Sequence, residues 1–157
     1  MNDVDTVLIH IEKENQYLMI YRNKKEYDIN KDKWIGVGGH VLPNESPEDA
    51  AIRETREETG LTLLNLTKRG IIYFEDTDYK NKIIVYTSNN FEGSIHECDE
   101  GTLAWVRKED LLNKLPIWEG DRVFLEKLIH THDMFCYKII YNKSELKSIT
   151  ELPYKED

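Results

Sequence analysis

The sequence predicts an α+β fold built around a mixed-sheet sandwich. Short segments with the two-residue alternation of strands outnumber segments with helical character. The two kinds do not alternate regularly, as they would in a parallel fold of βαβ units. The length of 157 residues favours a single domain, residues 1–157, which is long enough to bury a sizeable core.

The first forty residues predict a hairpin, a loop and a glycine-rich bend. The apolar alternation of TVLIHIE indicates a strand at Thr6–Glu12, and YLMIYR indicates a second strand after the turn-like KENQ. Residues 23–33 are polar and are typical of a loop. WIGVGGHV at 34–41 then predicts a short strand that runs into the bend.

The best-defined helix of the sequence follows this bend. Ser46 is a favourable N-cap, and Pro47 suits the first helical position. We expect the helix to run to about Thr59, because Gly60 can adopt the left-handed conformation that ends a helix.

The second half of the chain predicts a similar mixture of strands and helices. The expected strands are Gly70–Phe74, Lys82–Ser88, Leu103–Val106 and Met134–Tyr141, and the expected helices are Lys108–Leu115 and Glu119–Ile129.

The composition excludes some classes of partner. A net charge of −9 argues against a nucleic-acid polymer, which needs a basic footprint. No basic leader and no run of about 20 apolar residues is present, so we expect neither a signal peptide nor a membrane span. Cys98 and Cys136 show no CxxC spacing, so two free thiols in the cytoplasm are expected. We expect a monomer or a homodimer.

The helix at 46–59 carries an unusual concentration of carboxylates. Glu54, Glu57 and Glu58 are spaced i, i+3 and i+4, so they share one face and repel one another. One interpretation is a solvated face with ion pairs. The alternative is a site for Mg²⁺, a hard cation that prefers oxygen ligands and would also allow an anionic substrate to bind. Ile52 and Thr55 are expected on the opposite face, against the sheet.

Residues around the helix fit the metal interpretation. Gly38 and Gly39 allow the backbone to approach a ligand closely, and their carbonyls could join a coordination shell. Glu45 precedes the helix and could pair with Arg53, bracing the loop against the helix.

Residues 39–61 resemble the Nudix box, G-x5-E-x7-R-E-U-x-E-E-x-G-U, where U is a bulky apolar residue. The positions that match are Gly39, Glu45, Arg53, Glu54, Glu57, Glu58, Gly60 and Leu61. Thr55 stands where an apolar residue is usual, and its methyl group can still pack. A motif of this length is specific, and the resemblance implies an α/β/α sandwich with a mixed sheet between helices.

The resemblance also implies an activity and roles for these residues. Nudix enzymes cleave diphosphate linkages, and MutT-like members convert a nucleoside triphosphate to a monophosphate and pyrophosphate. Carried onto this chain, Glu57, Glu58 and the Gly39 carbonyl would bind Mg²⁺, with Mn²⁺ as an alternative. Glu54 would be a further ligand or the general base, and Arg53 would orient it.

Two later segments resemble MutT-like oxidised-purine triphosphatases. In HECDEGTLAWV, Glu97 takes the position of a late metal ligand, and Glu100 is the alternative. In LPIWEGD, Trp118 would stack on a base, while Asp121 or Glu119 would meet its polar edge. Trp118 could equally be a core aromatic, and the Glu97 loop could simply be solvated.

The glycine segment supplies two candidate binding residues and one difference from the family's relatives. Trp34 belongs either to the core or to the wall of the pocket, and Gly38 is expected to approach the substrate. Relatives that read 8-oxoguanine often carry Asn after this tryptophan, where this chain has Ile35. The five histidines show no zinc spacing, although His40 could contact phosphate.

Three functions remain open on the sequence alone. The first is hydrolysis of a nucleoside triphosphate such as 8-oxo-dGTP. The second is hydrolysis of ADP-ribose or a dinucleotide, which the WEGD segment disfavours. The third is a nucleotide-sensing module without catalysis, which the intact box disfavours.

Overall fold

The computed structural model describes residues 5–155, so the first four residues of the predicted domain lie outside it, as do the last two. The strands are β1 (Thr6–Lys13), β2 (Gln16–Tyr21), β3 (Trp34–Ile35), β4 (Val37–His40), β5 (Thr62–Leu63), β6 (Thr67–Asp76), β7 (Tyr79–Ser88), β8 (Phe91–Glu92), β9 (Thr102–Arg107), β10 (Phe135–Asn142) and β11 (Glu145–Glu151). The helices are α1 (Pro47–Thr59), α2 (Lys108–Asn113) and α3 (Glu119–His130).

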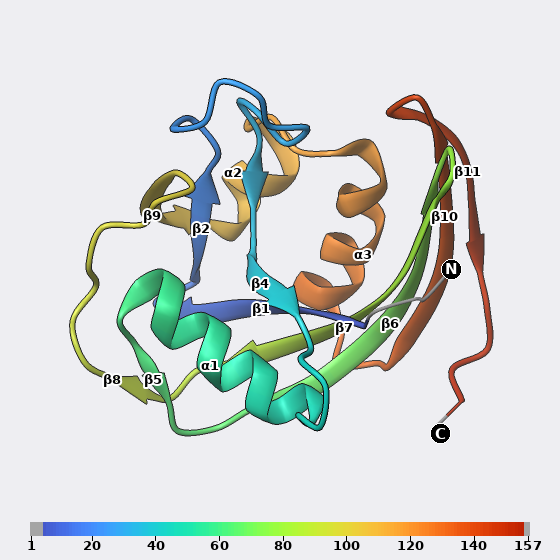
Figure 1. Cartoon of the computed structure of the whole chain (residues 1–157). Coiled ribbons are helices and arrows are strands. Elements are labelled where there is room, and N and C mark those ends of the chain that lie inside the picture. Colours follow the sequence, from blue (N-terminus) through green and yellow to red (C-terminus); the bar gives the residue numbers. More distant parts are fainter. Residues whose placement is uncertain (1–4, 156–157) are drawn as a thin grey trace.

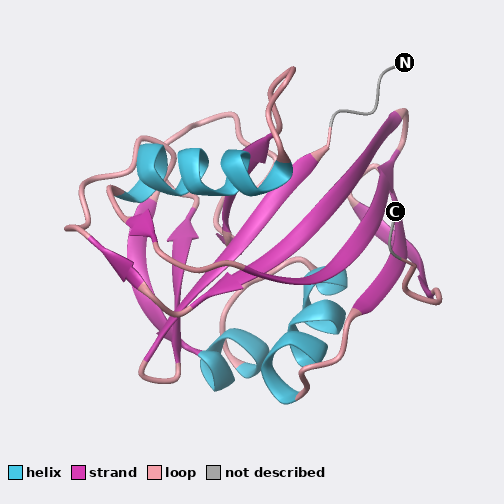
Figure 2. Ribbon diagram, turned by 90° about the horizontal axis from the view of Figure 1, so that it is seen from below, coloured by secondary structure: helices cyan, strands magenta, loops and turns pink. Residues whose placement is uncertain are grey.

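A mixed sheet lies between α1 on one side and α2 with α3 on the other (Figures 1 and 2). The order of the main path is β11-β10-β6-β7-β1-β2-β3, while β4 pairs with β1 and β9 pairs with β2. The pairs β1–β7 and β6–β10 are parallel, and the other pairs are antiparallel. The α+β sandwich predicted from the sequence is therefore confirmed.

The predicted elements are present, with differences at their ends. The helix from Pro47 to Thr59 matches the prediction, because its capping residues occur where the sequence placed them. The strand expected at Gly70–Phe74 is longer, since β6 and β7 continue through polar residues toward a tight turn. The strand β11 was not predicted, because ELKSITE has few apolar residues and pairs with only one neighbour at the sheet edge.

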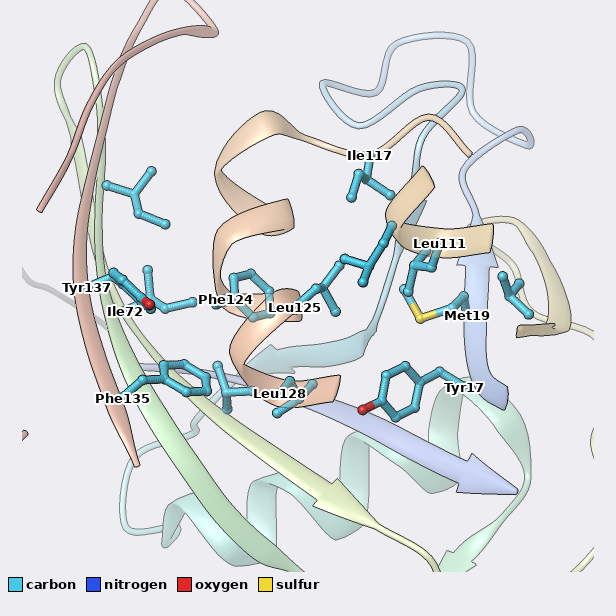
Figure 3. Packing of buried hydrophobic residues seen from close by; sticks show 14 of the residues in the cluster. Tyr17, Met19, Ile72, Leu111, Ile117, Phe124, Leu125, Leu128, Phe135 and Tyr137 are labelled. Carbon is cyan, nitrogen blue, oxygen red and sulfur yellow. The ribbon is translucent and has the colours of Figure 1, made fainter. Parts of the chain in front are cut away.

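The core has two parts, one on each face of the sheet. The larger part lies under α2 and α3 and contains Phe124, Leu125 and Leu128 of α3 (Figure 3). The smaller part lies under α1, against β1 residues such as Val7 and Ile9. Alternation along β1 explains this division, because successive side chains point to opposite faces.

One prediction for α1 is wrong. Ile52 was expected against the sheet, but its side chain is 37% exposed. The face that packs on the sheet instead carries four small residues, Ala50, Ala51, Thr55 and Thr59. A helix with small buried side chains can approach the sheet more closely than one that buries isoleucine.

Candidate functional site

Helix α1 begins and ends at well-defined capping interactions. The hydroxyl of Ser46 accepts a hydrogen bond from the Asp49 backbone N–H at 3.1 Å. Gly60 ends the helix with φ of 87°, in the left-handed region that favours glycine. These two caps set which residues of the helix face the neighbouring strand.

The glycine strand β4 lies directly against the carboxylates of α1. A Cβ atom at Gly39 would collide with the side chain of Glu54, and a Cβ atom at Gly38 would collide with the carbonyl of Val7. The Gly38 backbone N–H donates a hydrogen bond to Glu58 Oε1 at 3.0 Å. Gly39 is therefore needed for the close approach of α1 to β4, and Gly38 for the close approach of β4 to β1.

Two of the carboxylates on this face, Glu54 and Glu58, have raised pKa values. Burial raises the pKa of Glu58 to about 8, and the charges of Glu100 and Glu54 add to the effect, while the Gly38 N–H opposes it. Burial also raises the pKa of Glu54, opposed mainly by the positive charge of Arg53. Without a bound cation, Glu58 therefore holds a proton at neutral pH.

The predicted ion pair between Glu45 and Arg53 is present. Arg53 Nε lies 2.8 Å from Glu45 Oε2, and its Nη2 lies 3.0 Å from Oε1, so the pairing is bidentate. The same guanidinium donates to the His40 carbonyl at 3.0 Å and to Glu57 Oε1 at 3.0 Å. Its Nη1 lies 3.6 Å from Glu54 Oε1. Arg53 thus joins the loop before α1, the end of β4 and two of the three helix carboxylates.

These groups open onto a cavity of about 570 Å³, within the range of small-molecule sites. Five acidic side chains line it, and we call this group the acidic end: Glu54, Glu57, Glu58, Asp99 and Glu100. Neutral side chains of β1, β3, β7 and the 23–33 loop also line it, and we call this group the neutral end: Thr6, Leu8, Ile35, Asn30, Tyr79 and Asn81.

The late loop brings Glu100 to the cavity rather than Glu97. The Glu97 side chain is 88% exposed, pairs with Lys24 at 3.1 Å and does not line the cavity. Glu100 lines the cavity, and its charge contributes to the raised pKa values of Glu54 and Glu58. Its partner is Arg22, whose Nη1 lies 3.2 Å from Glu100 Oε1.

The aromatic residues expected at the substrate lie outside the lining of this cavity. Trp34 packs against Tyr21, with ring centroids 5.0 Å apart. Trp118 packs edge-on against Tyr141 and donates from Nε1 to Asn30 Oδ1 at 2.7 Å. Since Asn30 lines the cavity, Trp118 contacts its neutral end only through this amide.

The two acidic residues after Trp118 differ in environment. Glu119 is exposed at the start of α3. Burial raises the pKa of Asp121 to about 7, and this residue also does not line the cavity. Of the predicted substrate-binding residues, Gly38 lines the cavity, and so does His40, the candidate for a phosphate contact.

The structure adds residues that the sequence did not single out. Arg22, Asn30, Tyr79 and Asn81 come from a strand end, a loop and a hairpin, and no motif links them. Arg22 could have been noticed as the first cation after an apolar strand. No sequence pattern indicated Asn30, Tyr79 or Asn81, because only the tertiary fold brings these residues to the cavity.

The donor chemistry of the acidic end fits a hard divalent cation. Oxygen atoms of carboxylates and of the glycine backbone are the ligands that such a cation prefers. Burial, with a smaller contribution from the charges of Glu100 and Glu54, raises the pKa of Glu58, and a bound cation would favour its ionised form. Within residues 5–155, no three His, Cys, Asp or Glu side chains yet converge on one point suited to a metal. Glu57 is turned toward Arg53, and its side chain is 54% exposed, so it can rotate.

Two further observations concern the whole of the described chain. Cys98 and Cys136 are both buried free thiols, as predicted. In residues 5–155, no helix has the length and apolar character needed to cross a membrane.

Comparisons with known proteins agree with the motif and with the fold. The family model described as the NUDIX domain matches residues 1–128. The chain is 35% identical over 119 residues to an oxidized purine nucleoside triphosphate hydrolase of Danio rerio, covering 72% of this chain and 73% of the relative. It is 31% identical over 114 residues to an uncharacterized Nudix hydrolase, YvcI, of Bacillus subtilis, covering 66% and 72%.

Solved structures show the same similarity. A MutT protein from Bacillus halodurans superposes with a TM-score of 0.86 at 23% identity, covering 97% of this chain and 99% of that chain. A MutT protein from Methanosarcina mazei superposes with a TM-score of 0.70 at 27% identity, covering 81% and 94%.

Proposed function

The chain belongs to the Nudix family of hydrolases of phosphorus anhydrides, and from this premise we propose that it is a Mg²⁺-dependent pyrophosphohydrolase of nucleoside triphosphates. The products would be a nucleoside monophosphate and pyrophosphate. An oxidised purine nucleotide such as 8-oxo-dGTP is the proposed substrate, in line with the name of the Danio rerio relative.

The observation that carries this proposal is that the box carboxylates and the glycine strand line the same cavity. Glu54, Glu57, Glu58 and the Gly39 carbonyl would hold the metal, and Glu100, rather than Glu97, is the late carboxylate closest to this role. Bound Mg²⁺ would neutralise the charge of the phosphates and lower the pKa of a water molecule.

The protein's own residues would position the reacting groups. Glu54 is half-buried beside Gly39, so it could accept the proton of the attacking water as general base. The oxygen of that water forms a bond to phosphorus, the P–O bond to the departing group breaks, and pyrophosphate leaves. Arg53 would keep Glu57 and Glu54 in place through its contacts with Glu45 and the His40 carbonyl.

The neutral end of the cavity would receive the nucleoside. Leu8 and Ile35 provide apolar wall there, while Asn30 and Asn81 provide amide groups. Because Ile35 lacks an amide, recognition of an oxidised base must depend on other polar groups than in relatives with Asn at this position.

The test is hydrolysis in the presence of Mg²⁺ across 8-oxo-dGTP, dGTP, the other triphosphates, ADP-ribose and a dinucleoside polyphosphate, with products separated by chromatography. Pyrophosphate release with a kcat/KM at least 10-fold higher for 8-oxo-dGTP than for dGTP, about 1.4 kcal/mol, supports the proposal. A preference for ADP-ribose or the dinucleotide contradicts the substrate class. Tight binding without turnover would identify a sensing module.

Metal dependence has its own control. Omitting Mg²⁺ or adding a chelator should abolish turnover, and Mn²⁺ should restore part of it. Asp49→Asn is a matched variant for the acidic residues, since Asp49 lies on the same helix, is exposed and does not line the cavity. It should leave turnover unchanged.

A further inference from the structure

A buried amide in the wall of the cavity has an unused hydrogen-bonding group. Asn81 of β7 is only 8% exposed and lines the neutral end of the cavity. Its Nδ2 donates to Thr6 Oγ1 of β1 at 2.6 Å. Its Oδ1 is buried and has no hydrogen-bond partner in the described chain. Asn81 is not part of the box, but the box carboxylates line the same cavity.

The orientation of this amide is set by its neighbours. Thr6 Oγ1 also lies 3.2 Å from His40 Nδ1 of β4, and all three residues line the cavity. A hydroxyl has one hydrogen, so when Thr6 accepts from Asn81 it can donate to His40. If the amide were rotated, Oδ1 would face Thr6 and Nδ2 would lose its partner instead. In both orientations, one polar group of Asn81 stays unpaired.

An unpaired buried polar group is unusual in a folded protein. It destabilises the folded state relative to a paired group, and such groups in native structures call for an explanation. Leucine or methionine would fill the same space without this cost. A ligand that supplies the missing partner accounts for the amide at this position.

The position of Asn81 points to the nucleoside part of a substrate. Thr6 is directly opposite His40 in the β1–β4 pair, and β7 is the next strand on the far side of β1. Adjacent strands are about 4.8 Å apart, so Asn81 lies roughly 10 Å across the sheet from β4. The carboxylates proposed for the metal contact β4 at Gly38 and Gly39, so a nucleotide whose phosphates lie there reaches Asn81 when its sugar and base extend across β1 toward β7.

We propose that Asn81 is a specificity-determining residue whose Oδ1 accepts a hydrogen bond from a donor of the nucleoside, either a sugar hydroxyl or an N–H group of the base. Thr6 holds the amide in this orientation. Tyr79, two residues earlier on the same face of β7, has a side chain 48% exposed and rotates aside to give the donor access. This inference rests on the proposed function. Asn81 would supply an amide to the substrate, which Ile35 cannot do.

The experiment compares dGTP with three analogues that each lack one donor. These are 2′,3′-dideoxyguanosine triphosphate without the 3′-hydroxyl, N1-methyl-dGTP without the ring N–H, and dITP without the exocyclic amine. We expect the wild type to discriminate against one of them by roughly 10-fold to 100-fold in kcat/KM. Asn81→Leu should lower kcat/KM for dGTP to the value for that analogue, and it should leave kcat/KM for the analogue unchanged. The affected analogue identifies the donor.

Two outcomes overturn the inference. One is that Asn81→Leu lowers kcat/KM for all four nucleotides by the same factor, and the other is that it changes none. Asn113→Leu is the matched control, because Asn113 is an exposed amide at the end of α2 and does not line the cavity. It should behave as the wild type.

Variants at Thr6 keep the test decisive if Asn81→Leu does not fold. Thr6→Val removes the group that orients the amide, so discrimination should fall several-fold, whereas Thr6→Ser retains the hydroxyl and should preserve it. Equal discrimination by the valine and serine variants contradicts the inference. Circular dichroism and Tm establish that each variant is folded.

A binding experiment separates this inference from the proposed function. Metal-free protein is titrated with dGMP, and the side-chain NH₂ signals of Asn81, assigned by their loss in Asn81→Leu, are followed by ¹H–¹⁵N NMR. They should shift on binding, and Asn81→Leu should weaken binding by a factor similar to its effect on kcat/KM. If no triphosphate is hydrolysed, the proposed function fails, and this titration still tests Asn81. Unchanged Asn81 signals at saturation would refute the inference.

Discussion

The two faces of the sheet are packed in opposite ways. On one face, α1 buries only alanine and threonine and presents Glu54 and Glu58 to a cavity. On the other face, α3 buries Phe124, Leu125 and Leu128 in a core that includes the aromatic side chains of β10 (Figure 3). Both faces have an apolar core, but α1 contributes only small side chains to its core and is also held by caps, glycines and ion pairs, whereas α3 contributes large apolar side chains.

The helix that carries the proposed catalytic carboxylates is therefore not the helix that contributes most to apolar packing. Carboxylates that are buried close together cost free energy of folding, as the raised pKa values of Glu54 and Glu58 show. Apolar burial contributes about 25 cal/mol per Å². The strands supply large buried side chains to both faces, but among the helices α3 supplies Phe124, Leu125 and Leu128, whereas α1 supplies only alanine and threonine. The comparison predicts that substitutions on the α1 face affect turnover and those on the α3 face affect stability.

The largest effect is expected at Glu58. Glu58→Gln should lower kcat/KM by roughly 10³-fold, about 4 kcal/mol, because it removes a proposed metal ligand. The same variant should leave the free energy of unfolding of the metal-free protein unchanged or raise it at pH 8, since a buried charge is lost. Steady-state kinetics and urea unfolding measure the two effects. Retention of full turnover would show that Glu58 binds no catalytic metal.

The reverse pattern is expected at Phe124, a core residue of α3 that stacks on Phe135. Phe124→Ala should lower the free energy of unfolding by about 3–5 kcal/mol through lost burial and a new cavity. Turnover per folded molecule should change little at temperatures where the variant is folded. Ile52→Ala on the exposed face of α1 is the control and should cost less than about 1 kcal/mol. Equal losses at both positions would contradict the comparison.

Arg69 holds the C-terminus of α3 in place from β6. Its buried guanidinium donates to the backbone carbonyls of Leu128 and Thr131, at 3.2 Å and 2.6 Å. Arg69→Met would leave these carbonyls without donors, so unfolding free energy should fall by about 2–3 kcal/mol. The exposed Arg56→Met on α1 should be nearly neutral. Chemical denaturation of the pair measures the difference, and a neutral Arg69→Met would disprove this account of the helix end.

Substitutions of Glu97 and Glu100 test which of these two carboxylates supports the proposed metal site. Glu100→Gln should reduce kcat/KM by roughly 10-fold to 100-fold, the usual range for a group that supports a metal site. Glu97→Gln should stay within about 3-fold of the wild type, because an exposed pair with Lys24 contributes little. Kinetics at saturating and limiting Mg²⁺ distinguish metal affinity from turnover. If Glu97→Gln lowered kcat/KM more than Glu100→Gln did, Glu97 would be the residue that supports the metal site.

The smallest effect is the pH dependence of the metal-free protein between pH 6.5 and 8. Folding raises the pKa of Glu58 to about 8 and that of Asp121 to about 7, so the folded state binds more protons than the unfolded state in this range. Stability should therefore fall as pH rises. Buried His10, with its pKa lowered to about 3, affects stability only below about pH 6.5. Thermal unfolding should show a weaker dependence in Glu58→Gln, and an unchanged slope would contradict the assignment.

Local chemistry was readable from the sequence because it depends on residues close together in the chain. The caps of α1, the shared face of Glu54, Glu57 and Glu58, and the Glu45–Arg53 pair all lie within one segment of about 20 residues, where helical periodicity fixes the geometry. The resemblance to the Nudix box, and with it the family and fold class, came from the same segment.

The rest depended on pairing between distant strands. Glu100 rather than Glu97 reaches the cavity because the late loop is tied to Arg22, and Asn81 meets Thr6 only through the parallel pairing of β1 with β7. Trp118, a candidate for base stacking, packs against Tyr141 and donates a hydrogen bond to Asn30. The sequence by itself thus determined the helix, its carboxylates and the family. Only the tertiary structure decided which distant side chains share the cavity, because strand order and register do not follow from local pattern.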